Sequence, residues 1–376
     1  MERKLKIGIV CYPTFGGSGV VATELGKALA QKGHEIHFIT YSQPVRLGVL
    51  QKNVRYHEVN VNDYPLFLYP PYELVLASKM VDVAQHEGLD LLHVHYAIPH
   101  ASAAYMAKQI LKAHGQNLPF ITTLHGTDIT LLGKDASFEP VISFAINESD
   151  AVTAVSQSLR TDTYKLFGIN REIEVIPNFI EPSPIQDQVI QEIRSSFSPD
   201  GAPILIHISN FRPVKRVMDV MEIYKRLIQD KPYKLLMVGD GPERSKAEQF
   251  ARDNAMCHVT FVGNVRNPME LLSASDVMLL PSESESFGLS ALEAMACSVP
   301  VVASNAGGLP EVIRHGVSGL MSDVGNVEEM AKHVHYLTEK PERLNKFKQQ
   351  ALERSKAFDL QNILPQYEKI YYQLAK

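Results

Sequence analysis

The stretch LKIGIVCYPTFGGSGVVATELGKALAQKG, residues 5–33, decides the fold. It opens with an almost entirely apolar run over 5–11, which is typical of a strand buried on both faces. A glycine loop follows, and apolar residues then recur at helical spacing over 20–32 until Gly33. A strand, a glycine loop and a helix in this order predict the first unit of a parallel α/β sheet.

The same alternation continues outward along the chain in two series. The first series predicts strands at 34–40, 90–95, 119–124, 151–155 and 172–177, and helices around 72–86, 100–113 and 156–167. The second predicts strands at 203–209, 233–239, 258–263, 276–282 and 300–304, and helices around 216–229, 242–253, 268–273, 289–296, 326–338, 341–356 and 361–375. Residues 178–202 contain prolines and no clear strand, so they predict a linker with a short helix. We therefore expect two Rossmann-like domains, at 1–178 and 203–360, joined by a linker at 179–202.

Length and composition support two ordinary globular domains. A chain of 376 residues is longer than one hydrophobic core usually serves. Hydrophobic residues make up 45% and charged residues 21%, and the net charge of −5 gives no reason to expect nucleic acid as a partner. No apolar stretch is long enough to span a membrane. The three cysteines lie in apolar segments without CxxC spacing, which predicts buried thiols and a cytoplasmic location.

The glycine loop before the first helix is a candidate anion site. In open parallel sheets, ligands bind beyond the carboxyl ends of the strands. Glycines let a ligand approach the backbone, and the N-terminus of the helix favours negative charge. Residues 17–22 also fit the dinucleotide pattern G-x-G-x-x-A, but the acid that NAD binding requires at the end of the second strand is missing. A phosphate or sugar loop is therefore favoured over an NAD site and over a purely structural turn.

Two histidine motifs lie within or directly after strands in the first half. In LHGTD, residues 124–128, His125 comes directly after a strand, where an imidazole can donate to a sugar hydroxyl or to developing negative charge. His93 and His95 share one strand face, which would suit a metal, but no carboxylate or cysteine joins them locally. We favour a packed core histidine there, with Tyr96 at the end of the strand.

The second half carries a basic turn and two acidic residues. Arg212, Lys215 and Arg216 in SNFRPVKR lie at a strand-to-helix junction, where cations can hold a diphosphate; a solvated basic turn is the alternative. Glu285 in a loop and Glu293 in the next helix can each accept hydrogen bonds from vicinal hydroxyls. The glycine turns GDGP, 239–242, and NAGGLPE, 305–311, permit close backbone contacts but are equally compatible with plain turns.

The motifs together resemble a known family. The pattern E-x-F-G-L-x-x-x-E-A at 285–294, with HGTD, GGSG, the basic turn and G-G-x-P-E in this order, resembles the retaining family-4 glycosyltransferases of the GT-B fold. The resemblance covers nearly the whole chain. HVHYAIPHA, SNFRPVKR and ESFGLSALEAMAC are most similar to the members that transfer N-acetylglucosamine from UDP-N-acetylglucosamine to L-malate, at the start of bacillithiol synthesis. The resemblance implies two domains facing a cleft, with a C-terminal helix, 361–376, that returns to the first domain.

The resemblance also implies roles for particular residues. The residues implied in catalysis are His125, Lys215, Arg212 and Glu285. The donor is expected to contact Gly16, Gly17, Asn210, Gly239, Phe287, Gly288, Leu289 and Glu293. The acceptor is expected to contact Ser18, Tyr96, Thr123, Asn178 and Arg46.

Two positions depart from the family pattern. Relatives often place the clamp arginine five residues before the lysine, where this chain has Asn210; Arg212 lies only three before it. Relatives also carry a basic residue in the helix before AVTAV, where this chain has Ser143. Malate has two carboxylates and needs a cation, so Arg46 is the substitute candidate.

Several alternatives remain compatible with the sequence. The same chemistry could serve an inositol phosphate, a lipid or another sugar, although the lack of a basic amphipathic surface helix favours a small polar acceptor. An NAD-dependent oxidoreductase and a non-catalytic sugar-nucleotide-binding protein are the alternatives from other classes. We expect UDP-N-acetylglucosamine and L-malate as substrates, with no metal, cofactor, nucleic acid or membrane. A homo-oligomer remains open.

Overall fold

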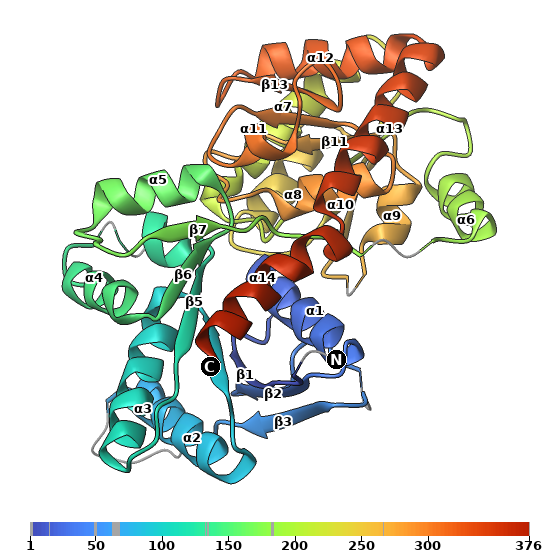
Figure 1. Cartoon of the computed structure of the whole chain (residues 1–376). Helices are drawn as coiled ribbons and strands as arrows, with labels where there is room; N and C mark the ends of the chain where they lie inside the picture. The colour runs from blue at the N-terminus through green and yellow to red at the C-terminus, as the bar shows by residue number, and fades with distance from the viewer. Residues whose placement is uncertain are drawn as a thin grey trace. The chain divides into compact units, whose positions relative to one another are not determined.

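The computed structural model describes residues 3–14, 16–48, 51–61, 68–131, 133, 135–181, 184–265 and 267–375. The chain divides into two compact units (Figure 1). Unit 1 comprises residues 1–178 and 361–376, and unit 2 comprises residues 179–360. Each unit is built on one parallel sheet flanked by helices, which confirms the predicted α/β class with two Rossmann-like domains.

The sheet of unit 1 has seven parallel strands among the described residues, in the order β3-β2-β1-β4-β5-β6-β7. The strands are β1 Lys6–Val10, β2 Glu35–Thr40, β3 Val54–Glu58, β4 Leu91–His95, β5 Phe120–Leu124, β6 Ala151–Ala154 and β7 Ile173–Val175. Strands β4 and β5 are buried at every residue, as continuous apolar runs predict. The strand order reverses between β1 and β4, so the predicted ligand position in this unit lies beyond the carboxyl ends of these two strands.

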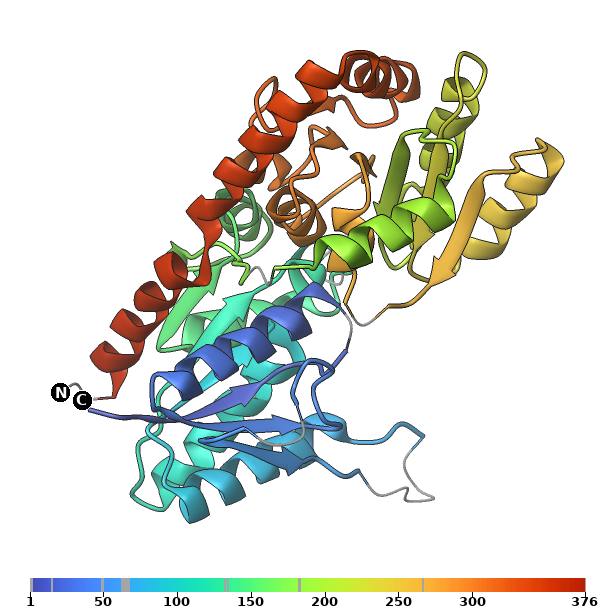
Figure 2. The same cartoon turned by 90° about the vertical axis from the view of Figure 1, so that its right-hand side faces the viewer.

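Helices cover both faces of the unit 1 sheet (Figure 2). They are α1 Gly17–Gln31, α2 Tyr72–Glu87, α3 Ser102–Ala113, α4 Glu139–Glu148, α5 Gln157–Leu166 and α14 Leu360–Leu374, with the short segments η1 Ala97–Ala101, which is kinked at Ile98, and η2 Thr127–Leu131. Figure 2 shows α1 on one face and α2 on the other. An apolar core between the sheet, α2 and α3 includes Val94, Met80 and Ala104. Gly88 ends α2 in the left-handed conformation that glycine adopts without strain.

The sheet of unit 2 repeats this plan with six parallel strands in the described part of the chain, in the order β10-β9-β8-β11-β12-β13. The strands are β8 Ile204–Ile208, β9 Lys234–Val238, β10 Val259–Gly263, β11 Val277–Leu280, β12 Val301–Ser304 and β13 Gly319–Ser322. The order reverses between β8 and β11. The predicted ligand position in unit 2 therefore lies beyond the ends of β8 and β11.

Helices also flank the sheet of unit 2. They are α6 Asp187–Phe197, α7 Val217–Leu227, α8 Arg244–Asp253, α9 Met269–Ser273, α10 Leu289–Ala296, α11 Leu309–Val312, α12 Val327–Glu339 and α13 Pro341–Ser355, with 3-10 turns η4 Pro213–Lys215 and η5 Lys356–Phe358. The apolar faces of α7 and α12 meet the sheet in one core that includes Tyr224, Val334 and Leu235. Because these apolar residues recur at helical intervals, the helices that carry them could be predicted from the sequence.

Two strands were missed by the sequence prediction. Strands β3 and β13 lie at sheet edges, each paired with one neighbour, β2 and β12. An edge strand buries less surface, so its residues can be short or polar and give no continuous apolar run. VRYHE in β3 has no fully buried residue, and GLMS in β13 has only four residues.

Two other expectations are corrected. Residues 179–202 belong to unit 2 rather than forming a separate linker, and Arg194 in α6 holds this segment through hydrogen bonds to Asp276 and the carbonyl of Ala274. Cys257 is exposed, because it lies in the turn before β10. Cys11 is buried as predicted, and Cys297 is half-buried.

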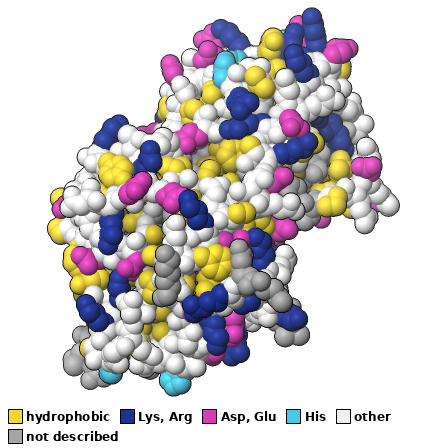
Figure 3. Space-filling model, in the orientation of Figure 1, with side chains coloured by type: hydrophobic (Ala, Val, Ile, Leu, Met, Phe, Trp, Pro, Cys, Tyr) yellow, Lys and Arg dark blue, Asp and Glu magenta, His cyan; other side chains and the backbone are white. Residues whose placement is uncertain are grey.

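The described surface carries mixed charge. On the face drawn in Figure 3, basic and acidic side chains are interspersed over both units, and neither sign forms a broad field. Interspersed charge agrees with the small net charge of −5. Among the described residues, every helix is too short or too polar to cross a lipid bilayer.

Candidate functional site

The N-terminus of α1 lies at the switch point of unit 1. Gly16 is the residue before the helix, no described side chain caps this end, and no acidic residue occupies its first turn. The first amide groups of a helix lack partners within the helix and carry a partial positive charge. Gly19 has a packing role as well, because a Cβ there would lie 2.4 Å from the carbonyl oxygen of Tyr12. The glycine loop therefore combines tight packing with a backbone surface suited to an anion.

Three predicted residues come together beside this helix end. Tyr96, which follows β4, donates a hydrogen bond of 2.7 Å from its hydroxyl to Ser18 Oγ in α1. The ring centroids of Tyr96 and His125 are 5.4 Å apart. Tyr96 has a positive φ of 91°, a conformation that a non-glycine residue seldom adopts. Strained backbone of this kind is often found at ligand sites. The structure thus groups Ser18, Tyr96 and His125, which we call the acceptor-side cluster.

His125 is held by a second histidine that sequence reasoning assigned to the core. His95 Nδ1 lies 2.7 Å from His125 Nε2, and the two rings stack at 5.0 Å. Burial lowers the pKa of His125 to about 3, and the pKa of His95 falls well below its usual value for the same reason, so both rings are neutral at pH 7. His95 Nε2 is buried and has no partner among the described residues. A buried acceptor without a partner costs less here than a buried N–H, which favours Nδ1–H on His95 donating to His125 and leaves the remaining proton of His125 on Nδ1.

The structure places Thr123 differently from the prediction. Its side chain is fully buried, and its hydroxyl hydrogen-bonds His93 Nε2 and Thr153 Oγ1, both at 2.7 Å. His93 Nδ1 in turn lies 2.8 Å from the hydroxyl of Tyr371 in α14. Thr123 therefore belongs to a buried network that attaches α14 to the sheet, and it does not present its hydroxyl to a ligand. Its position in the core was not evident because a threonine suits either role.

The remaining predicted acceptor residues have separate positions. Asn178 is buried, and its Oδ1 makes no hydrogen bond within the described part of the chain, which is unusual for a buried polar atom. Arg46 is half-buried in the loop after β2. Ser143 lies in α4 and donates a hydrogen bond to Glu139. These positions do not identify the cation expected for an anionic acceptor, and Arg46 stays a prediction.

Lys215 and Glu285 meet at the switch point of unit 2. Lys215 ends the turn η4 after β8, and Glu285 lies in the loop after β11. Lys215 Nζ is 2.7 Å from Glu285 Oε1, and Ser282 donates to the same oxygen at 2.8 Å. The side chains of Lys215 and Glu285 are 21% and 11% exposed, so the pair is largely shielded from water. Residues 70 positions apart are thus brought together as a positioned cation and carboxylate.

The glycine turn at 239–242 holds the basic turn in place. Gly239 has a φ of +120°, and a Cβ there would lie 1.8 Å from the carbonyl oxygen of Ser209. A Cβ on Gly241 would lie 2.0 Å from the carbonyl oxygen of Asn210, so this glycine is packed in a similar way. Asn210 and Arg212 themselves are exposed, with Arg212 directly before η4. The turn therefore has a packing requirement for glycine, and Asn210 and Arg212 project from a backbone that this contact fixes.

The loop before α10 presents backbone amides. Gly288 precedes α10 in the left-handed conformation with a φ of +96°, and no described side chain caps the helix. Phe287 is buried, and Leu289 is the first residue of the helix. Glu293 lies in α10 and is 8% exposed. The predicted donor groups Phe287, Gly288, Leu289 and Glu293 therefore share one short helix and the turn before it.

The glycines of NAGGLPE also prove to be structural. The amide of Gly308 donates to the carbonyl of Glu285 at 2.8 Å, and a Cβ on Gly307 would lie 2.0 Å from that oxygen. This contact fixes the backbone of the loop that carries Glu285.

His207 is a supporting residue that the sequence prediction missed. It is fully buried in β8; its Nδ1 lies 2.9 Å from the carbonyl of Leu279, and its Nε2 lies 2.8 Å from Ser209 Oγ. A carbonyl accepts only, so Nδ1 carries the proton and Nε2 accepts from Ser209. Ser209 Oγ accepts in turn from the amide of Phe211. A single histidine inside the apolar run PILIHIS was the signal available in the sequence.

The buried neutral histidines predict acid sensitivity. Burial lowers the pKa of His93 to about 3 and of His100 and His207 to about 4, from 6.5. The unfolded chain therefore binds more protons than the folded chain below pH 6.5, and stability falls as the pH is lowered. Each such histidine should cost about 2 kcal/mol at pH 5. Burial raises the pKa of Asp128 to about 6, so lowering the pH protonates this carboxyl group more readily in the folded chain than in the unfolded chain. This single group therefore offsets part of the loss of stability that the histidines cause.

We expect the thermal midpoint to fall clearly between pH 7 and pH 5 and to change little between pH 8 and pH 7. Scanning calorimetry across this range measures both. Equal midpoints at pH 7 and pH 5 would show that these imidazoles are not kept neutral by the fold.

The comparisons with known proteins agree with this arrangement. Two doubly wound units, each with polar groups at its switch point, define the fold class. The model of the family "Glycosyltransferase Family 4" matches residues 15–183, and the model "Glycosyl transferases group 1" matches residues 189–354. The chain is 48% identical to the N-acetyl-alpha-D-glucosaminyl L-malate synthase of Bacillus anthracis, over 99% of this chain and 98% of that protein.

Solved structures share the fold at lower identity. The sucrose-phosphate synthase of Thermosynechococcus elongatus matches with a TM-score of 0.81 and 22% identity, over 99% of both chains. Anabaena Alr3699/HepE, solved in complex with UDP and glucose, matches with a TM-score of 0.82 and 21% identity, over 98% of this chain and 99% of that chain. The chain belongs to the family-4 glycosyltransferases of the GT-B fold. The predicted glycosyltransferase activity is confirmed, and the oxidoreductase and non-catalytic alternatives are set aside.

Proposed function

We propose that the protein transfers N-acetylglucosamine from UDP-N-acetylglucosamine to the hydroxyl of L-malate, with retention at the anomeric carbon. The observation that carries the proposal is the 48% identity, over 99% of the chain, to a relative named for this reaction. The product would be the starting glycoside of bacillithiol synthesis. The site geometry supports a sugar-nucleotide donor and a small polar acceptor.

The donor side of the proposal rests on unit 2. Lys215 supplies a positioned ammonium for the diphosphate, with Arg212 projecting from the same turn. The amides of Phe287, Gly288 and Leu289 at the start of α10 suit a phosphate or sugar oxygen. Glu285 and Glu293 are carboxylates suited to the vicinal hydroxyls of sugar and ribose.

The acceptor side of the proposal rests on unit 1. Ser18 and Tyr96 offer adjacent hydroxyls, 2.7 Å apart, that can hydrogen-bond a carboxylate. His125 is neutral because burial lowers its pKa to about 3, and its Nδ1–H can donate to the transferred sugar. The uncapped start of α1 favours a nearby negative charge, which malate carries.

The mechanism that fits these groups needs no protein nucleophile. The diphosphate departs on the face from which malate attacks, so one of its oxygens can accept the proton of the malate hydroxyl. The bond from the anomeric carbon to the diphosphate oxygen breaks, and the bond to the malate oxygen forms on the same face. The protein's part is to hold both substrates in place and to stabilise the charge on the departing UDP. In this proposal the transfer requires neither a metal nor a cofactor.

A product assay tests the proposal. The full-length protein is incubated with UDP-N-acetylglucosamine and L-malate, and the product is examined by mass spectrometry and proton NMR. We expect UDP release, one product with the combined mass of N-acetylglucosamine and malate less water, and the small anomeric coupling constant of an α-linkage.

Parallel reactions with inositol phosphate, glycerol lipids and simple sugars test the acceptor. The proposal predicts clear preference for malate. UDP release with another acceptor and none with malate would overturn the assignment of the acceptor, whereas a β-linked malate product would overturn retention alone.

A further inference from the structure

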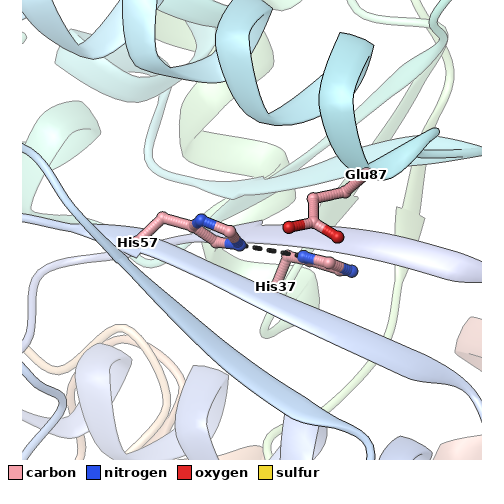
Figure 4. A group of neighbouring side chains, drawn as sticks. All are labelled: His37, His57 and Glu87. Atoms are coloured by element: carbon pink, nitrogen blue, oxygen red, sulfur yellow. Dashed lines mark hydrogen bonds between the residues drawn. The ribbon is translucent and has the colours of Figure 1, made fainter.

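A second polar cluster lies in unit 1 and shares no residue with the acceptor-side cluster. It consists of His37 in β2, His57 in β3 and Glu87 at the C-terminal end of α2 (Figure 4). One nitrogen or oxygen atom from each residue lies within 4.8 Å of the other two. Figure 4 shows the carboxylate of Glu87 directed at the two rings. Strands β2 and β3 and helix α2 thus bring two imidazoles and one carboxylate close together, although the residues are widely separated in the sequence.

The two imidazoles are close and nearly parallel. His37 Nδ1 lies 2.9 Å from His57 Nε2, with the ring planes 15° apart. His37 is fully buried and His57 is half-buried. A nitrogen–nitrogen hydrogen bond at this distance requires a lone pair on one of the two atoms, so at least one of the rings is neutral. Neutral imidazole is the form in which histidine binds a metal.

A carboxylate lies beside His37. The second nitrogen of His37, Nε2, is buried, makes no hydrogen bond to a described residue, and lies 3.3 Å from Oε1 of Glu35, the first residue of β2. Arg55 holds this carboxylate and also Glu87, with Nε 3.0 Å from Glu35 and Nη1 3.0 Å from Glu87 Oε2. In the tautomer with the proton on Nε2, on the side of the Glu35 carboxylate, the lone pair of His37 lies on Nδ1, the atom that faces His57. A carboxylate behind a histidine ligand is a common arrangement at metal sites.

We propose that His37 Nδ1, His57 Nε2 and Glu87 bind a divalent transition-metal ion of the Zn²⁺ class. Two histidine nitrogens and one carboxylate oxygen are a ligand set that Zn²⁺ accepts, with a fourth position for water. Tetrahedral bonds of 2.0–2.1 Å place two nitrogens about 3.3 Å apart, so the histidines need to separate by only roughly 0.4 Å. His57 then carries its proton on Nδ1 instead of Nε2. The C-terminus of α2 adds a partial negative charge that favours a cation.

The position of the cluster indicates a structural role. Glu35, beside His37, begins β2, and Lys6, which begins β1, lies 3.9 Å from it, so the surroundings of the cluster reach the amino edge of the sheet. The acceptor-side cluster follows the opposite, carboxyl edge. Strand β3 is an edge strand with no fully buried residue and so has little apolar surface to hold it. A metal shared by β2, β3 and α2 would attach this strand, which would raise the stability of unit 1 rather than take part in glycosyl transfer.

Zinc titration of the full-length protein tests the proposal. Protein stripped with a chelator is titrated with Zn²⁺ by calorimetry, and Co²⁺ is added separately to record its visible absorption. We expect one tight site, Co²⁺ bands of low coordination number, and a higher thermal midpoint with Zn²⁺. The variants H57Q and E87Q should each bind at least about 100-fold more weakly, and E35Q about 10–100-fold more weakly.

The matched control is H86N. His86 is adjacent to Glu87 on α2, but its side chain is 78% exposed, and its Nδ1 lies 3.0 Å from Asp82. Removing it should leave the tight site and the rise in midpoint unchanged, which excludes binding through His86. Circular dichroism checks that each variant is folded. The absence of a one-to-one site in the wild type, or unchanged binding in folded H57Q and E87Q, would overturn the proposal.

Discussion

Replacing Lys215 with alanine is expected to lower the turnover of glycosyl transfer at least 100-fold while the protein stays folded. In the proposed reaction, negative charge develops on the diphosphate as it departs. A fixed donor aimed at developing charge contributes roughly 10²–10³ in rate. The pairing with Glu285 at 2.7 Å positions the ammonium before the donor binds. Without Lys215, the carboxylate of Glu285 loses its cation and would itself repel the diphosphate, so both kcat and the affinity for the donor should fall.

Steady-state kinetics with varied donor concentration separate these two effects. The matched control is K246A, because Lys246 is a lysine of the same unit with a side chain 65% exposed and a loose ion pair to Glu243 at 3.5 Å. Its turnover should equal that of the wild type. Circular dichroism and the thermal midpoint verify the fold of both variants. If folded K215A turned over within about tenfold of the wild type, Lys215 would not be the residue that stabilises the departing group.

Replacing Gly239 with alanine is expected to destabilise unit 2 strongly, although it adds only one methyl group. The φ of +120° is unfavourable for any residue with a Cβ, and the added carbon would lie 1.8 Å from the carbonyl oxygen of Ser209. Strain of the first kind costs about 1–3 kcal/mol, and backbone displacement adds to it, so we expect about 3 kcal/mol or more. The thermal midpoint of unit 2 should fall by roughly 6–12 °C. Because Ser209 starts the turn that leads to Lys215, activity should fall as well.

The control for this substitution is G201A. Gly201 lies in the same unit with a φ of +74°, but a Cβ there would meet no described atom within 4 Å. The G201A variant should therefore lose only the free energy of unfolding that the strained backbone costs, about 1–2 kcal/mol. Its thermal midpoint should fall by roughly 2–8 °C. Scanning calorimetry of both variants isolates the steric part. Equal losses in G239A and G201A would mean that the contact between the two turns is not required.

Most of the fold was predictable because buried parallel strands are apolar on both faces. Runs such as LKIGIVC and DLLHVH were recognisable without any neighbour, and Gly33 follows the end of α1 where expected. The edge strands β3 and β13 were not, because pairing with a neighbour on one side leaves their sequences short or polar. Residues 179–202 look like a linker in sequence because the contacts of Arg194 with the loop before β11 cannot be inferred from local composition.

The site was only partly predictable. The candidate groups were identifiable because they follow strands, and strand ends gather at one edge of a parallel sheet. Local sequence could not show that Thr123 bonds His93 and Thr153 inside the core, or that His95 fixes the proton on His125. A hydroxyl or an imidazole can face either a ligand or the interior, and its partners decide which.

Residues 5–33 determined, by themselves, a strand, a glycine loop and an amphipathic helix, and hence a parallel α/β plan. Hydrophobic periodicity and the positions of glycines are local properties of the chain, so the sequence alone is enough to predict these elements. Tertiary structure alone decided that Lys215 faces Glu285, that Ser18 meets Tyr96, and that histidines of two strands and a glutamate of a helix share one point. Such contacts depend on strand order and register, which bring together residues that no local pattern links.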